Sequence, residues 1–269
     1  MRISFPSLLV ALLLQLAPLS PAAAQVAAPT DTTHKYQTPA GPVAPKPWYK
    51  GKLVRASVVP ALLIGYGAYT FDGGGFYTNQ NANRDIHRLF PTYRTKLDNL
   101  LIFAPYFELG AVALAGVESR NDRLNIGLVI LKSEALMLTS VFAIKHLTRE
   151  TRPDGSDNLS FPSGHTAQAF LAASIVHTEF KDKSQWYGIG AYTIAGSVAA
   201  LRMINTKHWQ SDVVAGAGIG ILSAHLAYLS HRNRWGRKPR LLDGTSLAPT
   251  WQPGAGGGPG LIFTWRPTR

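Results

Sequence analysis

Two cations, Lys145 and Arg152, form the first of three short blocks in this 269-residue chain whose residue types could do chemistry on an anion. They are seven residues apart, almost two helical turns, so both would project from one face of a continuous helix. Pro153 disfavours helical geometry at Arg152, so we expect the helix to end just before Arg152. A planar guanidinium and a point charge together suit an anion with several oxygens. The alternative for this block alone is a solvated basic helix end.

The second block, Pro162-Ser163-Gly164-His165, has the features of a helix start. Ser163 can cap the helix, Pro162 fits its first turn, and Gly164 lets the backbone approach a ligand closely. Free N–H groups and the positive dipole at a helix start bind phosphate oxygens. His165 would then lie beside the anion, with a pKa suited to supplying a proton. The alternative is an ordinary loop–helix junction with an incidental histidine.

The third block contains Arg202, His208 and Asp212. The four-residue spacing of His208 and Asp212 puts them on one helical face, where the carboxylate can fix the imidazole tautomer. The other ring nitrogen then stays free as a nucleophile. Arg202 would not share that face on an unbroken helix, so we expect a turn near Asn205. The alternative is a capping aspartate and a surface histidine.

The composition narrows the possible classes of protein. The chain has 27 Lys and Arg against 15 Asp and Glu, a formal net charge of +12, and no cysteine. The absence of cysteine excludes a disulfide scaffold, a thiolate zinc site, an iron–sulfur cluster and a cysteine nucleophile. The positive charge fits three partners: nucleic acid, an anionic membrane surface or a phosphate-bearing substrate.

Four regions follow one another along the chain. Residues 1–24 are expected to be an export signal, because a short apolar run follows Arg2 and small residues precede Gln25. Residues 25–52 are predicted to be a Pro-rich linker and residues 53–238 a single helical domain. Residues 239–269 form a Gly/Pro-rich tail in which 261–265 could be a short strand docking on the body.

The domain contains six apolar segments that are longer than typical strands and rich in Ala, Leu and Gly. They predict an all-α fold, a compact helical bundle. Ionisable residues inside several segments (Lys132, Glu134, Arg202 and His225) and a mean hydropathy of only +0.01 argue against six membrane spans. The segments lie at about 53–71, 98–117, 124–147, 164–180, 187–205 and 213–230.

Taken together, the three blocks resemble the signature of the type 2 phosphatidic acid phosphatase and vanadium haloperoxidase superfamily, over about residues 98–230. The resemblance implies that His208 attacks phosphorus to form a phosphohistidine, that Asp212 orients it, and that His165 protonates the leaving alkoxide. One departure is Leu201, where the family usually has a serine. The resemblance assigns the remaining site residues to phosphate binding: Lys145, Arg152, Arg202, Ser163 and Gly164.

The expected activity is that of a metal-independent phosphomonoesterase. The block residues lack paired carboxylates for Mg²⁺, and three cations can take its place, so we expect no metal and no cofactor. The apolar segments favour a lipid phosphate substrate such as phosphatidate, a polyprenyl pyrophosphate or a lipid A phosphate. The alternatives are an exported non-specific acid phosphatase and, at lower weight, a vanadium-dependent haloperoxidase. A nucleic-acid partner is disfavoured because the basic residues are dispersed and the chain is expected to be exported.

The expected location is the cell envelope, with membrane association and the site on the exported, periplasmic side. If the signal is cleaved and all six segments span, however, the third ends in the cytoplasm and carries Lys145 with it. The resemblance and the basic residues from Arg232 to Arg240 place the site outside. We therefore expect that some segments do not span, first of all the short 53–71 segment, or that the bundle rests on the membrane.

Overall fold

The structure is a computed structural model that describes residues 51–232, 245–251 and 259–265. The expected export signal (1–24), nearly all of the linker (25–52) and much of the tail (239–269) lie outside the described residues. So does most of the basic cluster that follows Arg232.

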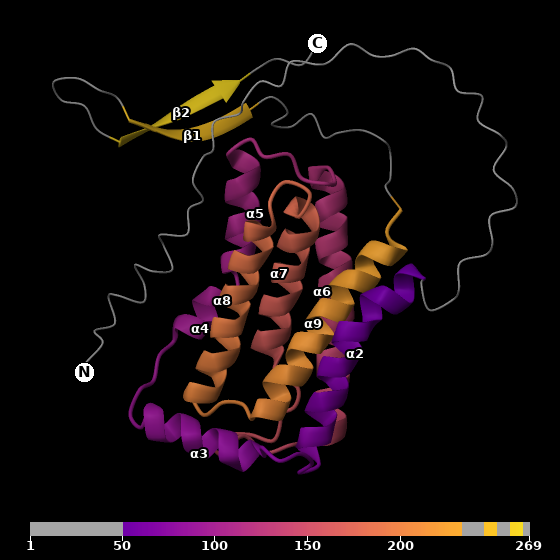
Figure 1. Ribbon diagram of the computed structural model, residues 1–269, viewed down its shortest axis with the longest axis vertical. Helices are drawn as coiled ribbons and strands as arrows, with labels where there is room; N and C mark the ends of the chain where they lie inside the picture. The colour runs from indigo at the N-terminus through magenta and orange to yellow at the C-terminus, as the bar shows by residue number, and fades with distance from the viewer. Residues whose placement is uncertain (1–50, 233–244, 252–258, 266–269) are drawn as a thin grey trace, which may run out of the picture. The chain divides into compact units, whose positions relative to one another are not determined.

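The described chain is helical apart from one hairpin, which confirms the predicted all-α bundle (Figure 1). Five expected segments, all except the second, each become one helix whose bounds lie within three residues of the prediction at both ends. The helices are α2 Lys52–Phe71, α3 Asn79–Leu89, α4 Leu97–Leu101, α5 Ala104–Leu114, α6 Arg123–Thr148, α7 Gly164–Phe180, α8 Gln185–Ile204 and α9 Gln210–Ser230.

The second expected segment, 98–117, is not one helix but two, α4 and α5. Pro105 lies in the first turn of α5. Proline has no N–H to donate to the preceding turn and clashes with a continuing helix, but it is tolerated at a helix start. The break therefore follows from Pro105, and it leaves α4 as a separate short helix.

Helix α3 was not predicted from the sequence, because it has no apolar run. It begins at a cap in which the Thr78 hydroxyl accepts a hydrogen bond from the Asn81 N–H at 3.3 Å. Its inner side is held by Ala82 and Asn79, which are both buried. Asn79 bonds the backbone and the hydroxyl of Ser211, so a polar contact replaces the usual apolar face.

In the tail, strands β1 (Thr245–Trp251) and β2 (Pro259–Trp265) pair antiparallel. The predicted strand at 261–265 therefore exists, and its partner in the sheet is β1.

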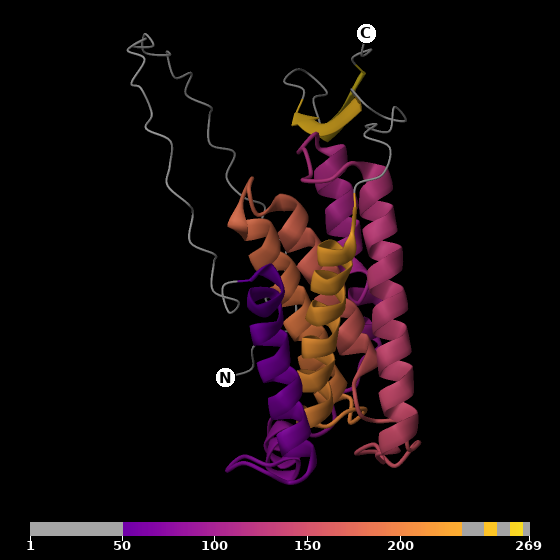
Figure 2. The same cartoon turned by 90° about the vertical axis from the view of Figure 1, so that its right-hand side faces the viewer.

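Helices α7 and α9 form the centre of the bundle (Figures 1 and 2). Helix α9 packs against α2, α6 and α7, and α7 also packs against α8. A Cβ placed on Gly216 would lie 2.5 Å from the Ser163 carbonyl oxygen, and one on Gly220 would lie 2.1 Å from that of Ala167. Two glycines one turn apart thus let the backbones of α7 and α9 approach closely.

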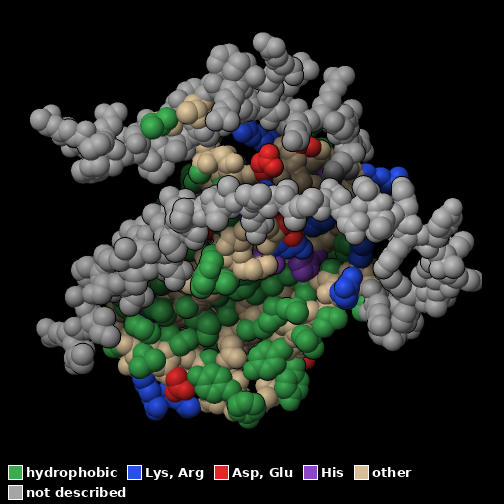
Figure 3. All heavy atoms as spheres, turned by 45° about the horizontal axis from the view of Figure 1, so that its top comes forward, with side chains coloured by type: hydrophobic (Ala, Val, Ile, Leu, Met, Phe, Trp, Pro, Cys, Tyr) green, Lys and Arg blue, Asp and Glu red, His purple; other side chains and the backbone are tan. Residues whose placement is uncertain are grey.

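Among the residues that the structure describes, three helices are long and apolar enough to cross a membrane: α2, α6 and α9, with 20, 26 and 21 residues. The segment 53–71, which we expected to be too short, is one of them, because α2 covers it completely. On α2 and α6, large apolar side chains such as Leu62, Leu131 and Phe142 are more than half exposed. Figure 3 shows apolar side chains gathered in a broad patch on one face of the molecule.

Candidate active site

The three sequence blocks meet at one end of the bundle, where α6 ends, α7 begins, α8 ends and α9 begins (Figure 1). The connection between α6 and α7, residues 149–163, lies there too. Segments far apart in the chain thus bring their polar residues together at this end.

His208 and Asp212 form a buried pair. His208 Nδ1 lies 3.1 Å from Asp212 Oδ2, and both side chains are almost fully buried. The prediction that they share a helical face is wrong in detail, because α9 begins at Gln210 and His208 precedes it. Asp212 is in the first turn of α9 and also accepts the Trp209 N–H at 2.9 Å. It therefore caps the helix and holds the histidine at once.

Two further donors fix the Asp212 carboxylate. The Ser160 hydroxyl donates to Oδ2 at 2.5 Å, and the Ser211 hydroxyl donates to Oδ1 at 3.2 Å. With four hydrogen bonds, this carboxylate has little rotational freedom, and it can orient His208 firmly.

The contacts of His208 define its tautomer. Arg152 Nη1 lies 3.2 Å from His208 Nε2. Because a guanidinium can only donate, Nε2 must be the acceptor, and the ring proton is on Nδ1, where it is donated to Asp212. This tautomer has the Nε2 lone pair directed toward the cation that would bind an anion.

The first block lies as expected, with one shift. We expected helix α6 to end just before Arg152, but it ends at Thr148. Arg149 is its C-cap and has a left-handed backbone conformation. Arg152 is on the exit loop, where Nε bonds Asp157 Oδ1 at 2.7 Å. Lys145 donates to the carbonyl oxygens of Leu159 and Ser160 in the same loop.

The second block is a helix start, as predicted. Ser163 is the N-cap of α7, and its fully buried hydroxyl accepts the Thr166 N–H at 3.4 Å. Pro162 does not fit the first turn as expected, because it precedes the cap and follows a cis peptide bond. Gly164 is the first residue of the helix, and His165 follows it with Nε2 2.8 Å from Asn99 Oδ1.

In the third block, the expected turn is present, because α8 ends at Ile204 with Asn205 as its cap. Arg202 is in the last turn and is buried; its Nη1 donates to Asp98 Oδ2 at 2.7 Å. Its Nε is also buried and has no hydrogen-bond partner in the described protein. A buried guanidinium N–H without a partner is costly and suits an anionic ligand.

The electrostatics of the site keep both histidines neutral. Burial, opposed by Asp212 and reinforced by the charges of Arg202 and Arg152, lowers the pKa of His208 to about 4. Burial first, then Arg202 and the other site cations, lowers the pKa of His165 to about 4 as well. At neutral pH neither ring carries a proton on its free nitrogen.

Four polar residues near the site were not assigned from the sequence: Ser160, Glu150, Asp98 and Asn99. Ser160 is two residues before the second block, and this proximity could have indicated that it belongs to the site. Burial and the charge of Asp212 raise the pKa of Glu150, so Glu150 is a neutral carboxyl beside that carboxylate. Asp98 and Asn99 come from an apolar segment in which no spacing relates them to the blocks.

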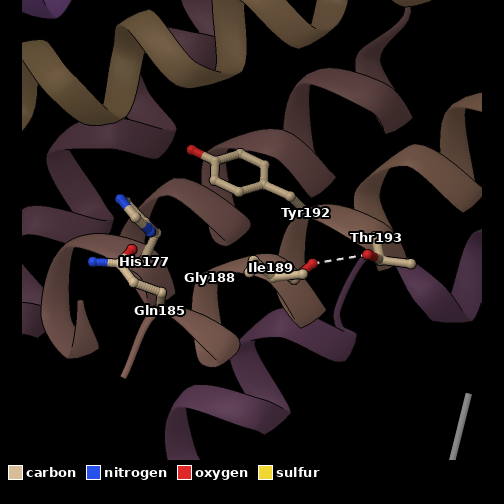
Figure 4. Close-up of a pocket in the computed structure, with 6 residues that line it drawn as sticks. All are labelled: His177, Gln185, Gly188, Ile189, Tyr192 and Thr193. Carbon is tan, nitrogen blue, oxygen red and sulfur yellow. Dashed lines mark hydrogen bonds between the residues drawn. The ribbon is translucent and has the colours of Figure 1, made fainter. Parts of the chain in front are cut away.

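A surface pocket of about 400 Å³ lies elsewhere, lined by residues of α7 and α8 (Figure 4). His177 is twelve residues after His165, about 18 Å along the helix, so the pocket lies far from the blocks. Its walls are mainly apolar, with Tyr192 and Ile189 among them, and they include none of the block residues. Among the described residues, no cluster of His, Asp and Glu has the arrangement of a metal site.

Residues 124–236 match the PAP2 superfamily, so this part of the chain is similar to that superfamily. This range contains all three blocks and helices α6 to α9, and it excludes α2 to α5.

One curated relative is the lipid A 1-phosphatase of Porphyromonas gingivalis, which is 35% identical over 140 residues. The match covers 51% of this chain and 31% of the relative, so the chain spans about a third of that protein's length. A solved structure, LpxE of Aquifex aeolicus, is similar with a TM-score of 0.40 and 22% identity, over 54% of this chain and 93% of that one.

Proposed function

We propose that this chain is a metal-independent phosphatase that removes a phosphate group from a lipid through a phosphohistidine at His208. The observation that carries the proposal is the state of His208: Nδ1–H is held by Asp212, and the Nε2 lone pair is beside the Arg152 guanidinium. A nucleophile so placed needs no base to activate it, because it is neutral in the free protein.

In the first step, His208 Nε2 attacks phosphorus, the ester P–O bond breaks, and a proton from His165 goes to the leaving alkoxide. In the second step, His165 takes a proton from water, the hydroxide attacks phosphorus, and the P–N bond breaks to release phosphate. Arg152, Arg202 and Lys145, with the N–H groups at the start of α7, stabilise the charge of the equatorial oxygens. Four hydrogen bonds hold Asp212, which keeps His208 in line throughout.

His165 must be protonated to act as an acid, although it is neutral in the free protein. The positive charges of Arg202, Arg152 and Lys145 contribute to its lowered pKa. A bound phosphate dianion would neutralise these charges and raise the pKa of His165. Substrate binding thus favours the protonated form of His165, which the first step requires.

A lipid is the proposed substrate class for two reasons. The described part of the chain has three helices with the length and composition of membrane spans, and α6, which carries Lys145, is one of them. The curated relative is named for its action on the 1-phosphate of lipid A, so a lipid A-type phosphate is the first candidate. We also propose a phosphatase domain at 53–238 that follows an export signal, with the site on the periplasmic side.

Phosphate release by the purified full chain in detergent tests the proposal. The panel contains lipid A, phosphatidate, a polyprenyl pyrophosphate and a soluble aryl phosphate, all in EDTA. We expect release from at least one lipid and none by His208→Ala. Activity on the aryl phosphate alone would indicate a non-specific acid phosphatase. Equal release by wild type and His208→Ala, or complete loss in EDTA, would contradict the mechanism.

A further inference from the structure

Helix α4 lies outside the residues that match the superfamily, yet two of its adjacent residues contact two residues of the candidate site. Asp98 binds Arg202, and Asn99 binds His165. Both contacts join positions far apart in the sequence, and neither residue belongs to one of the three blocks.

Asp98 determines which edge of the Arg202 guanidinium is free. Its side chain is 2% exposed, with Oδ2 accepting Arg202 Nη1 at 2.7 Å and Oδ1 accepting Asn205 Nδ2 at 3.2 Å. Arg202 Nε is buried and has no hydrogen-bond partner among the residues that the structure describes. Because Asp98 binds only Nη1, the Nε edge of the Arg202 guanidinium is left to bind an anion.

Asn99 determines the tautomer of His165. The Asn99 Oδ1 atom can only accept, so the His165 Nε2 atom at 2.8 Å must carry the ring proton. Proton exchange with a leaving group or with water is then left to Nδ1. The hydrogen bond also restricts rotation of the ring.

The position of α4 is tied to the same turn that carries Arg202. The side chain of Asn205, the cap of α8, accepts the Thr95 N–H at 3.0 Å and donates to the Thr95 carbonyl at 2.8 Å. Because Thr95 is only two residues before the start of α4, these hydrogen bonds hold the first turn of α4 against the end of α8.

We infer that Asp98 and Asn99 are positioning residues of the phosphatase site: Asp98 presents Arg202 to the phosphate, and Asn99 holds His165 with Nδ1 free for proton transfer. This inference rests on the phosphatase proposal. It extends the functional unit beyond the superfamily region, to the segment before α5.

The test for Asn99 compares Asn99→Leu and Asn99→Asp, with Leu100→Ala, an exposed neighbour on the same helix, as control. Asn99→Leu should lower kcat roughly 10- to 100-fold with little change in KM, because a misplaced proton donor slows chemistry and not binding. Asn99→Asp keeps the acceptor and should retain most of kcat. Leu100→Ala should match wild type.

The pH profile of kcat separates positioning from a structural role. The charged groups that act on His165 are Arg202, Arg152 and Lys145, and the one carboxylate is Asp98. An added carboxylate at position 99 stabilises the imidazolium, so Asn99→Asp should move the alkaline limb to higher pH. Asn99→Leu removes the acceptor and should move the limb to lower pH.

For Asp98, the measurement is inhibition by inorganic phosphate. Asp98→Asn should raise the inhibition constant about tenfold, because Arg202 loses its orientation. If Asp98→Asn does not fold, Asp98→Glu is measured in its place. This variant should also raise the inhibition constant, because the longer side chain displaces the Arg202 guanidinium. Unchanged kcat and pH limb in both Asn99 variants, or an unchanged inhibition constant in a folded Asp98 variant, would overturn the inference. Because wild type and His208→Ala are measured alongside, failure of the phosphatase proposal itself would be recognised separately.

Discussion

At the scale of single residues, the site is organised around the two ring nitrogens of His208. Asp212 accepts the proton of Nδ1, and Arg152 donates to Nε2, so each nitrogen has a fixed role before substrate arrives. In the proposed mechanism, a histidine held this way is the nucleophile and lies beside the cation that binds the phosphate group.

The first prediction concerns pH. The pKa of His208 is lowered to about 4, so the ring loses its nucleophilic lone pair only below that pH. His165 is neutral in the free protein, so its proton must arrive with a monoanionic substrate, and phosphate monoesters lose that proton near pH ~6. We expect kcat/KM for a short-chain lipid phosphate to fall below pH about 4 and above pH ~6. An acid limb near the ordinary histidine pKa, ~6.5, would contradict the lowered value.

The sequence predicted the residues of the three blocks and several of their local structures, because helix caps and the four-residue spacing depend on near neighbours. Ser163 caps α7, and His208 pairs with Asp212, as expected. Asp98 and Asn99 could not be found this way. Their partners are more than 60 residues away, and only the packing of α4 against α7 and α8 brings them together.

At the scale of elements, the site depends on how closely α7 and α9 pack. Ser163 donates its backbone N–H to the Asp212 carbonyl at 3.0 Å, so the starts of the two helices are joined directly. Gly216 and Gly220 make this approach possible, because no side chain separates the backbones.

The second prediction is that Gly220→Ala destabilises the protein. Its Cβ would lie 2.1 Å from the Ala167 carbonyl oxygen and 2.9 Å from the Leu171 nitrogen, both backbone atoms that cannot move independently of α7. We expect a loss of about 1–3 kcal/mol or more, measured as a lower midpoint of thermal unfolding in detergent. The matched control is Gly196→Ala on α8, where nothing lies within 4 Å and the higher helix propensity of alanine should leave stability equal or slightly greater. Equal midpoints for the two variants would contradict the packing argument.

The bounds of most helices could be predicted from apolar runs, but two elements could not. Helix α3 is polar and is held by Asn79 bonding to Ser211, a contact invisible to hydrophobic patterning. The division of 98–117 depended on Pro105, a signal present in the sequence. The prediction of one continuous segment followed the long apolar run and did not use this proline.

At the scale of the whole molecule, the distribution of apolar surface separates two kinds of long helix. In α2 and α6 only 17% and 28% of the apolar window is buried within the protein, whereas in α9 it is 61%. Helix α9 therefore serves as the bundle's centre, and α2 and α6 present apolar side chains outward. The low mean hydropathy argued only against six membrane spans, because polar segments and loops offset these apolar helices.

The third prediction is that the full chain stays with membranes after a carbonate wash. Helices of 20 residues or more reach about 30 Å, the thickness of the hydrocarbon core. We expect the protein in the pellet after the wash and in the supernatant only after detergent. Release by carbonate alone would show that α2, α6 and α9 do not span, and that the bundle rests on the surface.

The central claim, a covalent phosphohistidine at His208, is tested most directly by trapping it. Wild type, His165→Ala and His208→Ala are mixed with a ³²P-labelled lipid phosphate and denatured within seconds. The account predicts label on wild type within seconds. His165→Ala should be labelled more slowly, because His165 also supplies the proton for the leaving alkoxide. The label should be stable in base, lost in acid and absent from His208→Ala. Label on His208→Ala, or phosphate release by wild type with no labelled protein at any time, would contradict the account.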